Sequence, residues 1–403
     1  MSPPGRPKGE PLSAQHEGRR AGPPGSSEGD SPGAQRAGRP VRPWAALPFV
    51  LAPRAAPSRL LTWASPLVAL ALTVLCGMLL FAALGKPPLA AVEVFFIEPL
   101  RSLRGVSEVL LKATPLVLCA VGLALCFRAN VWNIGAEGQL IVGALAGGAV
   151  ALMATRETSG LVVVAVLLAA IAGGMAWAAI TALLRDRFHA NEILVSLMLV
   201  YVAQLLLSYM VHGPLKDPAG FGFPQSALFE APARLPRLLE GTRLHVGALL
   251  ALAAAAAAWL LLARGLIGFQ LKVAGLAPLA ARYAGFSHRR VLWFVLLVSG
   301  GLAGLAGAAE VAGPIGQLTP SISPGYGFAA IIVAFVGRLH PFGIVGAALV
   351  MALFYIGGEL AQSRLGLPAA LTGIYQGLLL FFLLGCDSFI HYRLRWRGVA
   401  RAA

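Results

Sequence analysis

Long apolar segments, separated by short polar ones, constrain this chain more than any other feature of its sequence. A segment of about 20 apolar residues crosses the ~30 Å hydrocarbon core of a bilayer as a single α-helix. Of the 403 residues, 58% are hydrophobic and only 12% are charged, whereas soluble proteins carry about 25% charged residues. Composition and segment length together predict an all-α polytopic membrane protein with about ten transmembrane helices.

Ten apolar segments support this prediction, and the eighth is short enough to indicate a broken or tilted helix. They cover residues 61–84, 108–127, 134–154, 160–184, 191–211, 246–263, 291–313, 326–337, 343–361 and 369–385. We therefore expect a transmembrane domain over residues 59–390. Residues 1–58 are rich in Pro, Gly, Ser, Ala and Arg and have no apolar periodicity, which predicts a disordered basic tail.

The distribution of basic residues indicates the orientation of the chain. They gather in the tail 1–58, in the short loops around Arg185–Arg187 and 264–290, and in the basic C-terminal tail 391–403. Because cytoplasmic loops carry the excess of lysine and arginine, we expect both termini in the cytoplasm. Topology also accounts for the net charge of +15, so we expect no nucleic-acid partner.

One polar stretch, Phe127–Leu140, interrupts the apolar pattern where two predicted helices meet. Its candidate path residues are Asn130, Trp132, Asn133, Glu137 and Gln139. Polar groups at membrane depth cost several kcal/mol unless they meet a partner or water, so these side chains predict a substrate path. The alternative is a cytoplasmic turn followed by polar packing between helices. Asn191, Glu192 and Tyr326, at the starts of two further spans, complete the candidate set.

The inner segment 264–290 is the second informative stretch. Pro278 suits the first turn of a helix, and Gly285 suits the left-handed residue that ends one. We expect a brief amphipathic helix parallel to the membrane. It would either rest on lipid headgroups or enter a groove on a soluble motor subunit.

Two other segments have structural interpretations. The small residues of Ser299–Gly307 lie at three- and four-residue spacing, which predicts close helix packing. The outer loop 212–245 contains five prolines. It is either a docking surface or cap, or a solvated connector with one short helix near 233–240.

Several function classes lack their signatures in this sequence. No Gly-x-x-x-x-Gly-Lys-Ser/Thr loop occurs, so ATP, if used, is bound by another chain. The four cysteines and seven histidines show no metal-ligand spacing, and we expect no metal, no cofactor and no enzyme activity. An ion-driven secondary transporter would call for inverted repeats or paired acids, and an intramembrane enzyme for a clustered catalytic set. Both stay as alternatives.

Several motifs resemble the permeases of bacterial ABC importers for nucleosides, which are related to permeases for simple sugars and branched-chain amino acids. They are Ala113-Thr-Pro-Leu, Phe127–Leu140, Asn191-Glu-Ile-Leu-Val-Ser-Leu-Met-Leu, Gly275–Gly285 and Gly325-Tyr-Gly-Phe-Ala-Ala-Ile-Ile-Val-Ala. The resemblance covers about residues 60 to 390. It identifies Gly275–Gly285 as similar to the cytoplasmic coupling helix of that family, with Leu279 where the general loop has an acidic residue.

The resemblance also implies a division of labour. This chain would be a permease subunit of the bacterial inner membrane, with nucleosides as cargo and simple sugars or branched-chain amino acids as the alternative. Its partners would be an ABC ATPase, a second permease of a different sequence, and a periplasmic or lipid-anchored substrate-binding protein. The residues expected to couple it to the ATPase are Gly275, Pro278, Ala280, Ala281, Arg282, Tyr283 and Gly285.

Overall fold

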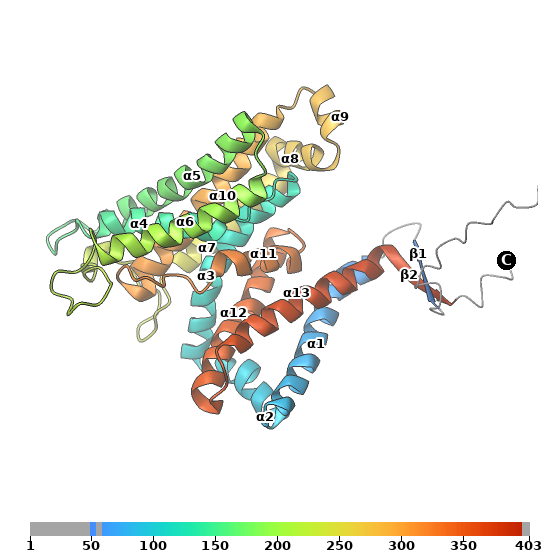
Figure 1. Cartoon of the computed structure of the whole chain (residues 1–403), viewed down its shortest axis with the longest axis horizontal. Helices are drawn as coiled ribbons and strands as arrows, with labels where there is room; N and C mark the ends of the chain where they lie inside the picture. Colours follow the sequence, from blue (N-terminus) through green and yellow to red (C-terminus); the bar gives the residue numbers. More distant parts are fainter. Residues whose placement is uncertain (1–48, 54–58, 397–403) are drawn as a thin grey trace, which may run out of the picture. The chain divides into compact units, whose positions relative to one another are not determined.

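The computed structural model describes residues 49–53 and 59–396. Its α-helices are α1 (Arg59–Ala83), α2 (Pro88–Val92), α3 (Leu103–Arg128), α4 (Ala136–Ala151), α5 (Val162–Phe188), α6 (Glu192–His212), α7 (Gly247–Arg264), α8 (Leu266–Leu276), α9 (Pro278–Tyr283), α10 (His288–Glu310), α11 (Tyr326–Val336), α12 (Pro341–Leu365) and α13 (Ala370–His391). Short π- or 3₁₀-helical turns are η2 (Glu93–Ile97), η3 (Glu98–Leu100), η4 (Ala231–Ala233) and η5 (Val311–Ile315). These helices lie within one compact unit, Leu51–Leu394, drawn in Figure 1.

Each of the ten predicted spans coincides with a helix, namely α1, α3 to α7, and α10 to α13. Eight of these helices are long and apolar enough to cross a membrane. The other two are α4, with 16 residues, and α11, with 11, both shorter than the ~20 residues of a full span. The all-α polytopic fold is confirmed, and α11 is the short eighth segment that the sequence indicated.

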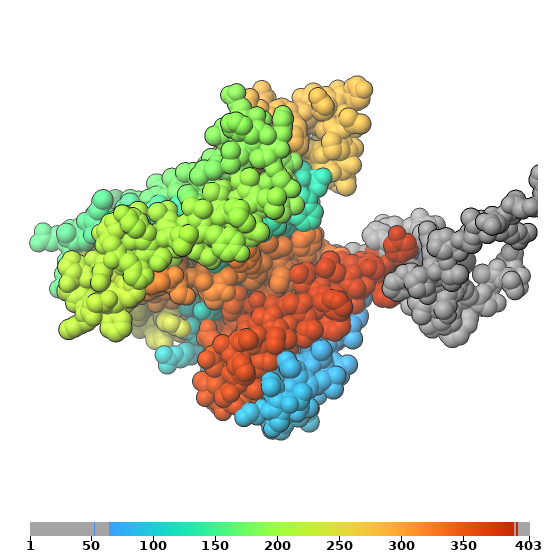
Figure 2. All heavy atoms as spheres, in the orientation of Figure 1, coloured from blue at the N-terminus to red at the C-terminus, as the bar shows by residue number. Residues whose placement is uncertain are grey.

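The interior of the bundle is built around α3, α10 and α12. Their apolar stretches are 89%, 72% and 61% buried, whereas those of α1, α5, α6, α7 and α13 are each only 22% buried. A helix that is apolar all round can be enclosed by others, so α3 forms the centre of the packing. The outer helices turn one face to the bundle and leave the other uncovered, as Figure 2 shows for α6 and α13.

Glycines bring α4, α5 and α10 into backbone contact. A Cβ atom on Gly143 would lie 2.2 Å from Gly304 Cα, and one on Gly174 would lie 2.1 Å from the carbonyl oxygen of Gly300. Larger side chains at these positions would push the helices apart. The prediction that Ser299–Gly307 serves helix packing is confirmed.

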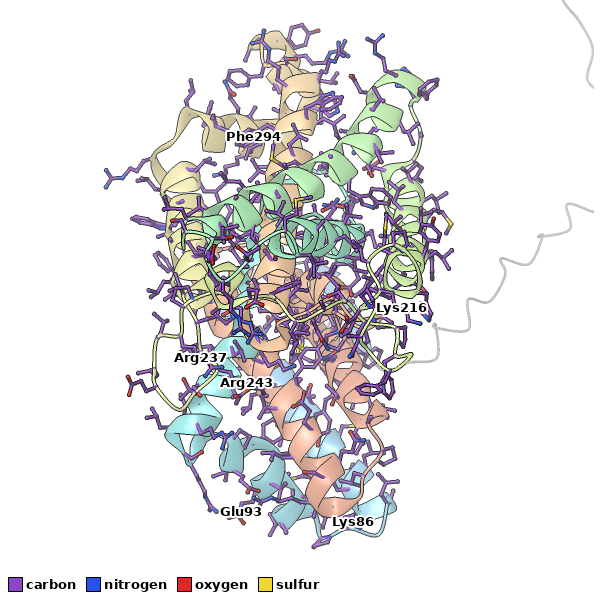
Figure 3. The ribbon with its side chains drawn as sticks, turned by 90° about the vertical axis from the view of Figure 1, so that its left-hand side faces the viewer. Lys86, Glu93, Lys216, Arg237, Arg243 and Phe294 are labelled. Atoms are coloured by element: carbon purple, nitrogen blue, oxygen red, sulfur yellow. The ribbon has the colours of Figure 1, made fainter. Side chains whose placement is uncertain are left out.

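The loop between α6 and α7 is a strap across one end of the bundle. Phe229 N–H donates to the Gly316 carbonyl and Leu235 N–H to the Ala312 carbonyl, both at 2.8 Å. Figure 3 shows Lys216, Arg237 and Arg243 of this strap away from the end of α10 at which Phe294 lies. The short helix near 233–240 that one alternative expected is wrong, since only the single turn η4 forms. Pro236 has no N–H to donate and disfavours helical backbone in the residue before it.

The segment between α7 and α10 forms α8 and α9, which project at the end where α10 begins (Figure 1). Pro278 lies in the first turn of α9, and Gly285 follows the helix with a φ of 78°. The brief helix predicted between these two residues is confirmed. Leu279 and Tyr283, one turn apart, are 70% and 94% exposed, while Ala281 is 4% exposed.

Two short strands, β1 (Phe49–Pro53) and β2 (Tyr392–Trp396), pair in a two-stranded sheet. The prediction of disorder for residues 1–58 is therefore wrong for Phe49–Pro53. The sequence Phe-Val-Leu suits a strand, but the average composition of the tail concealed it. Residues 1–48, 54–58 and 397–403 lie outside the described residues, and the cytoplasmic location of both tails stays a prediction.

Candidate functional site

The polar stretch Phe127–Leu140 covers the end of α3, a non-helical link over residues 129–135, and the first turn of α4. Asn130 adopts the left-handed conformation with a φ of 56°, which asparagine accepts more readily than most residues. Asn130 and Trp132 are exposed, whereas Asn133 and the first turn of α4 are buried. One short stretch therefore has an exposed half and a buried half.

In the buried half, Asn133 and Gln139 form an amide pair with at most 1% exposure. Asn133 Nδ2 donates to Gln139 Oε1 (3.0 Å) and to Ser299 Oγ (3.1 Å), and Gln139 Nε2 donates to Asn133 Oδ1 (3.2 Å). The N–H of Gly135 donates to the same Asn133 oxygen at 3.0 Å. Because both amides have protein partners, this cluster joins the α3–α4 link to α10 without a solute.

Glu137, which is 2% exposed, faces the N-terminus of α11. Its Oε2 accepts a hydrogen bond of 2.6 Å from Gly327 N–H. First-turn N–H groups have no partner within a helix, and the helix dipole favours a negative charge there. The approach is close, since a Cβ atom on Gly327 would lie 2.2 Å from Glu137 N. Glu137 thus binds α4 to α11, and its place in the substrate path stays a prediction.

Tyr326, the first residue of α11, is completely buried. Its hydroxyl donates to Glu310 Oε1 at 3.4 Å, and its ring centroid lies 5.4 Å from that of Tyr355 and 5.6 Å from Lys112 Nζ. These neighbours enclose the ring. Tyr326 therefore offers no open stacking surface in this structure, although the sequence pattern suggested one.

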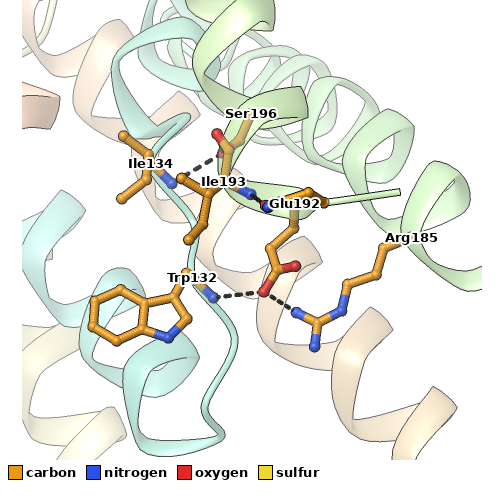
Figure 4. Close-up of polar contacts among 7 residues, drawn as sticks. Trp132, Ile134, Arg185, Glu192, Ile193 and Ser196 are labelled. Atoms are coloured by element: carbon orange, nitrogen blue, oxygen red, sulfur yellow. Dashed lines mark hydrogen bonds and ion pairs between the residues drawn. The ribbon is translucent and has the colours of Figure 1, made fainter. Parts of the chain in front are cut away.

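The exposed half meets the beginning of α6 (Figure 4). The N–H of Trp132 donates to Glu192 Oε1 at 3.3 Å, and the same oxygen forms an ion pair with Arg185. Ile134 N–H donates to Ser196 Oγ at 3.1 Å. Trp132 is 39% exposed, and its ring centroid lies 5.3 Å from that of Phe127 and 6.3 Å from that of Phe335. The structure therefore brings together Trp132 and Glu192, which lie far apart in the sequence.

A cavity of about 580 Å³ opens beside Glu192. Its walls are Arg185, Asp186, His189, Ala190, Asn191, Glu192, Ile193, His288, Arg289 and Leu292. Asn191 caps α6, because its Oδ1 accepts a hydrogen bond of 2.9 Å from Ile193 N–H. The other polar side chains that line the cavity are Arg185, Asp186, His189, Glu192, His288 and Arg289. A lining of this kind suits water or a polar ligand rather than lipid.

Gly275, near the end of α8, connects the projecting segment to the polar stretch. A Cβ atom on Gly275 would lie 2.0 Å from the carbonyl oxygen of Arg128. Arg128 Nε in turn donates to the Leu339 carbonyl at 2.9 Å, in the link between α11 and α12. The end of α8 therefore packs directly against the backbone at the beginning of Phe127–Leu140.

The sequence-predicted coupling residues form one continuous segment from the end of α8 to the turn after α9. They are Gly275, Pro278, Ala280, Ala281, Arg282, Tyr283 and Gly285. Contact between this segment and an ATPase stays a prediction. In the part of the chain that the structure describes, no three His, Cys, Asp or Glu side chains gather as metal ligands.

Sequence reasoning missed the partners that the candidate residues bind. Ser196 lies 62 residues from Ile134, Ser299 lies 166 residues from Asn133, and Gly327 lies 190 residues from Glu137. No local pattern pairs residues at such separations. In the sequence, Ser299 indicated only close helix packing, and Gly327 appeared only as part of a family motif.

A bundle with eight helices that are long and apolar enough to cross a membrane defines a multi-pass membrane protein. Residues 105–384 match the family described as the permease component of the branched-chain amino acid transport system, and the chain belongs to this family. It is a permease component of an ABC importer, and the ATPase is a different component of such importers.

Several curated relatives are similar along most of this chain. A glucose ABC transporter permease of Haloferax volcanii is 38% identical, over 85% of this chain and 93% of the relative. A guanosine permease of Bacillus subtilis is 30% identical over 83% and 97%, and a nucleoside permease of Lactococcus lactis is 27% identical over 79% and 89%. No solved structure matches the chain. The resemblance inferred from the motifs is confirmed, and the two alternatives from other classes are set aside.

Proposed function

We propose that this chain forms half of the membrane path of an ATP-driven importer that takes up nucleosides across the bacterial inner membrane. A second permease of different sequence forms the other half. A separate ATPase binds and hydrolyses ATP on the cytoplasmic side, where both termini of this chain lie. A periplasmic or lipid-anchored protein delivers the cargo. Relatives named for guanosine and for nucleosides, which align with 83% and 79% of this chain, support the cargo.

The observation that carries the cargo assignment is the exposed Trp132 beside Glu192. A nucleoside is neutral, with an aromatic base and many hydrogen-bonding groups that lose water on entering the path. Trp132 is 39% exposed, and the uncovered part of its indole offers the base a stacking surface. Asn191 and Glu192 at the neighbouring cavity offer an amide and a carboxylate to its polar edge.

A simple sugar is the second candidate cargo. The observation in its favour is the 38% identity to a glucose permease over 85% of this chain. Sugar hydroxyls would use the same amide and carboxylate groups, and an indole also packs against a sugar ring. The two candidates therefore differ in measurable uptake rather than in the side chains that they require.

Uptake of radiolabelled solutes tests the assignment. Cells with and without this gene are compared for guanosine, adenosine, uridine, glucose, ribose and leucine, with the partner ATPase intact or altered in its nucleotide-binding loop. We expect nucleoside uptake to disappear in both the deletion and the ATPase mutant. Loss of glucose uptake alone would assign the sugar, and uptake that ignores the ATPase would overturn the proposal.

We also propose that α9 is the contact to the ATPase. Leu279 and Tyr283 are 70% and 94% exposed and lie on one face of α9. The double substitution Leu279→Ser/Tyr283→Ser should lower substrate-stimulated ATP hydrolysis of the purified complex in detergent at least tenfold. Phe188→Ser, at a position that is 72% exposed, is the control and should leave hydrolysis unchanged. Unchanged hydrolysis in the double variant would show that α9 only rests on lipid.

A further inference from the structure

The outer helices α1, α5, α6 and α7 are buried to the same small extent, yet their uncovered faces differ in chemistry. Over residues 64–83 of α1, 164–183 of α5 and 247–263 of α7, every exposed position carries an apolar residue. These faces suit the hydrocarbon of a bilayer, which offers no hydrogen bonds. They set the expectation for a lipid-facing helix in this molecule.

The uncovered face of α6 departs from this pattern. Its exposed large side chains include Leu194, Met198, Tyr201, Leu205 and Tyr209, at the three- and four-residue spacing of one helix face. Gln204 is also exposed and lies next to this row. At ~1.5 Å per residue, Gln204 lies about 18 Å from Glu192 and about 12 Å from His212 along the helix axis. It is therefore close to mid-membrane.

Three polar side chains on this face have no partner within the described residues. They are the amide of Gln204 and the hydroxyls of Tyr201 and Tyr209, whose side chains make no hydrogen bond there. Tyr201 and Tyr209 are 56% and 64% exposed. An amide without partners at the centre of a bilayer is costly, and polar residues at that depth face a water-filled path or another protein.

The cytoplasmic end of the same face leads into the cavity beside Glu192. Ile193, which is 39% exposed, and Asn191 both line that cavity of about 580 Å³. The uncovered face that carries these polar groups therefore extends to a charged opening at one end of the bundle. Between Glu192 and His212 the helix carries no charged residue. A surface of this kind holds a neutral solute weakly, which suits passage.

We propose that the uncovered face of α6, with Tyr201, Gln204 and Tyr209, is a wall of the solute path. The Gln204 amide and the two phenol groups bind a neutral solute that carries hydroxyl groups or ring nitrogens, in place of the water that it loses. This proposal rests on the proposed function and adds the residues that select the cargo. Residues of α6 lie on the surface shown in Figure 2.

Cysteine labelling shows whether this face of α6 is in contact with water, with lipid or with another protein. Gln204→Cys is compared with Ala256→Cys, an exposed position about equally deep on α7, in a chain whose half-buried Cys76 and Cys386 are replaced by serine. We expect a charged, membrane-impermeant thiol reagent to label Gln204→Cys in the complete complex at least tenfold faster than Ala256→Cys. Excess transported solute should slow that labelling severalfold. Tyr201→Cys is a second position with the same expected behaviour.

Equal labelling of the α6 and α7 positions would overturn the proposal, because it would place the α6 face against lipid. Disulfide formation with the second permease in place of labelling would also overturn it and show a subunit interface.

Transport supplies the second readout. Gln204→Leu should lower uptake at least fivefold with an unchanged amount of assembled complex, whereas Ala256→Leu should not change uptake. Full uptake by Gln204→Leu would refute the proposal that α6 lines the solute path, while leaving the proposed function intact. Wild-type uptake that does not depend on the ATPase would refute the proposed function instead, so the two failures are distinguishable.

Discussion

Two amides at membrane depth, in Gln139 and Gln204, have opposite surroundings. Gln139 is 1% exposed and exchanges hydrogen bonds with Asn133, which also binds Ser299. Gln204 is exposed on α6 and has no partner in the part of the chain that the structure describes. Polarity within a span therefore does not by itself mark a path. A paired polar group holds helices together, whereas an unpaired one needs water, solute or another subunit.

The largest expected effect tests the close contact between α4 and α11 at Glu137 and Gly327. Gly327→Ala would place a Cβ atom 2.2 Å from the backbone nitrogen of Glu137, and neither backbone can yield without separating α4 from α11. We expect a cost of about 3 kcal/mol or more, with at least a tenfold loss of folded protein. Folded yield after detergent extraction, measured by size-exclusion chromatography, is the readout.

Gly346→Ala on α12 is the matched control, because a Cβ atom there has no heavy atom within 4 Å. Its yield should equal that of the wild type. A normal yield of Gly327→Ala would contradict the close approach of α11 to Glu137.

The second prediction compares the two amides directly. Asn133→Leu leaves the buried Gln139 amide without its partner, at an expected cost of about 2–3 kcal/mol. Asn133→Leu/Gln139→Leu removes both side-chain amides and should recover part of that loss, since no buried side-chain amide is then left without its partner. Gln204→Leu should cost nothing in stability. Thermal unfolding in detergent measures all three variants, and equal losses for Asn133→Leu and Gln204→Leu would contradict the different surroundings of the two amides.

The same contrast shows how far the sequence predicts this molecule. Hydropathy placed all ten spans, and Pro278 and Gly285 placed α9, because these signals are local. The stretch Phe127–Leu140 was also found locally, through polar residues in an apolar context. What decides its roles is not local, since the partners Ser299 and Gly327 lie 166 and 190 residues away. The polar face of α6 went unnoticed because a single glutamine in an apolar span changes hydropathy little.

His245, a buried polar side chain outside the spans, adds a pH dependence to the comparison. Burial lowers its pKa to about 4, from about 6.5 in an unfolded chain. Between these values the unfolded state binds more protons, so stability is complete above about pH 6.5 and falls as the pH falls toward 4. The expected loss from this group at pH 5 is on the order of 2 kcal/mol.

His245→Asn tests this loss, because the asparagine oxygen can still accept the hydrogen bond of 3.1 Å that Gly247 N–H donates to His245 Nδ1. The variant should lose less stability than the wild type between pH 7 and pH 5 in thermal unfolding. His212→Asn, at an exposed position, should keep the wild-type loss. An unchanged pH dependence of His245→Asn would show that another group sets it.

The last prediction concerns the ion pair of Glu192 and Arg185, which is less buried than Gln139 and less exposed than Gln204. Glu192 is partly buried, forms an ion pair with Arg185, and accepts the N–H of Trp132 at 3.3 Å. Glu192→Gln removes the charge but keeps an oxygen for that N–H, so it should cost about 1 kcal/mol or less and retain uptake. Glu192→Ala removes both contacts and should lower uptake severalfold, because Trp132 is no longer held beside the cavity. If uptake falls equally in both variants, the charge rather than the hydrogen bond matters at this site, and Glu192 acts through Arg185 instead of Trp132.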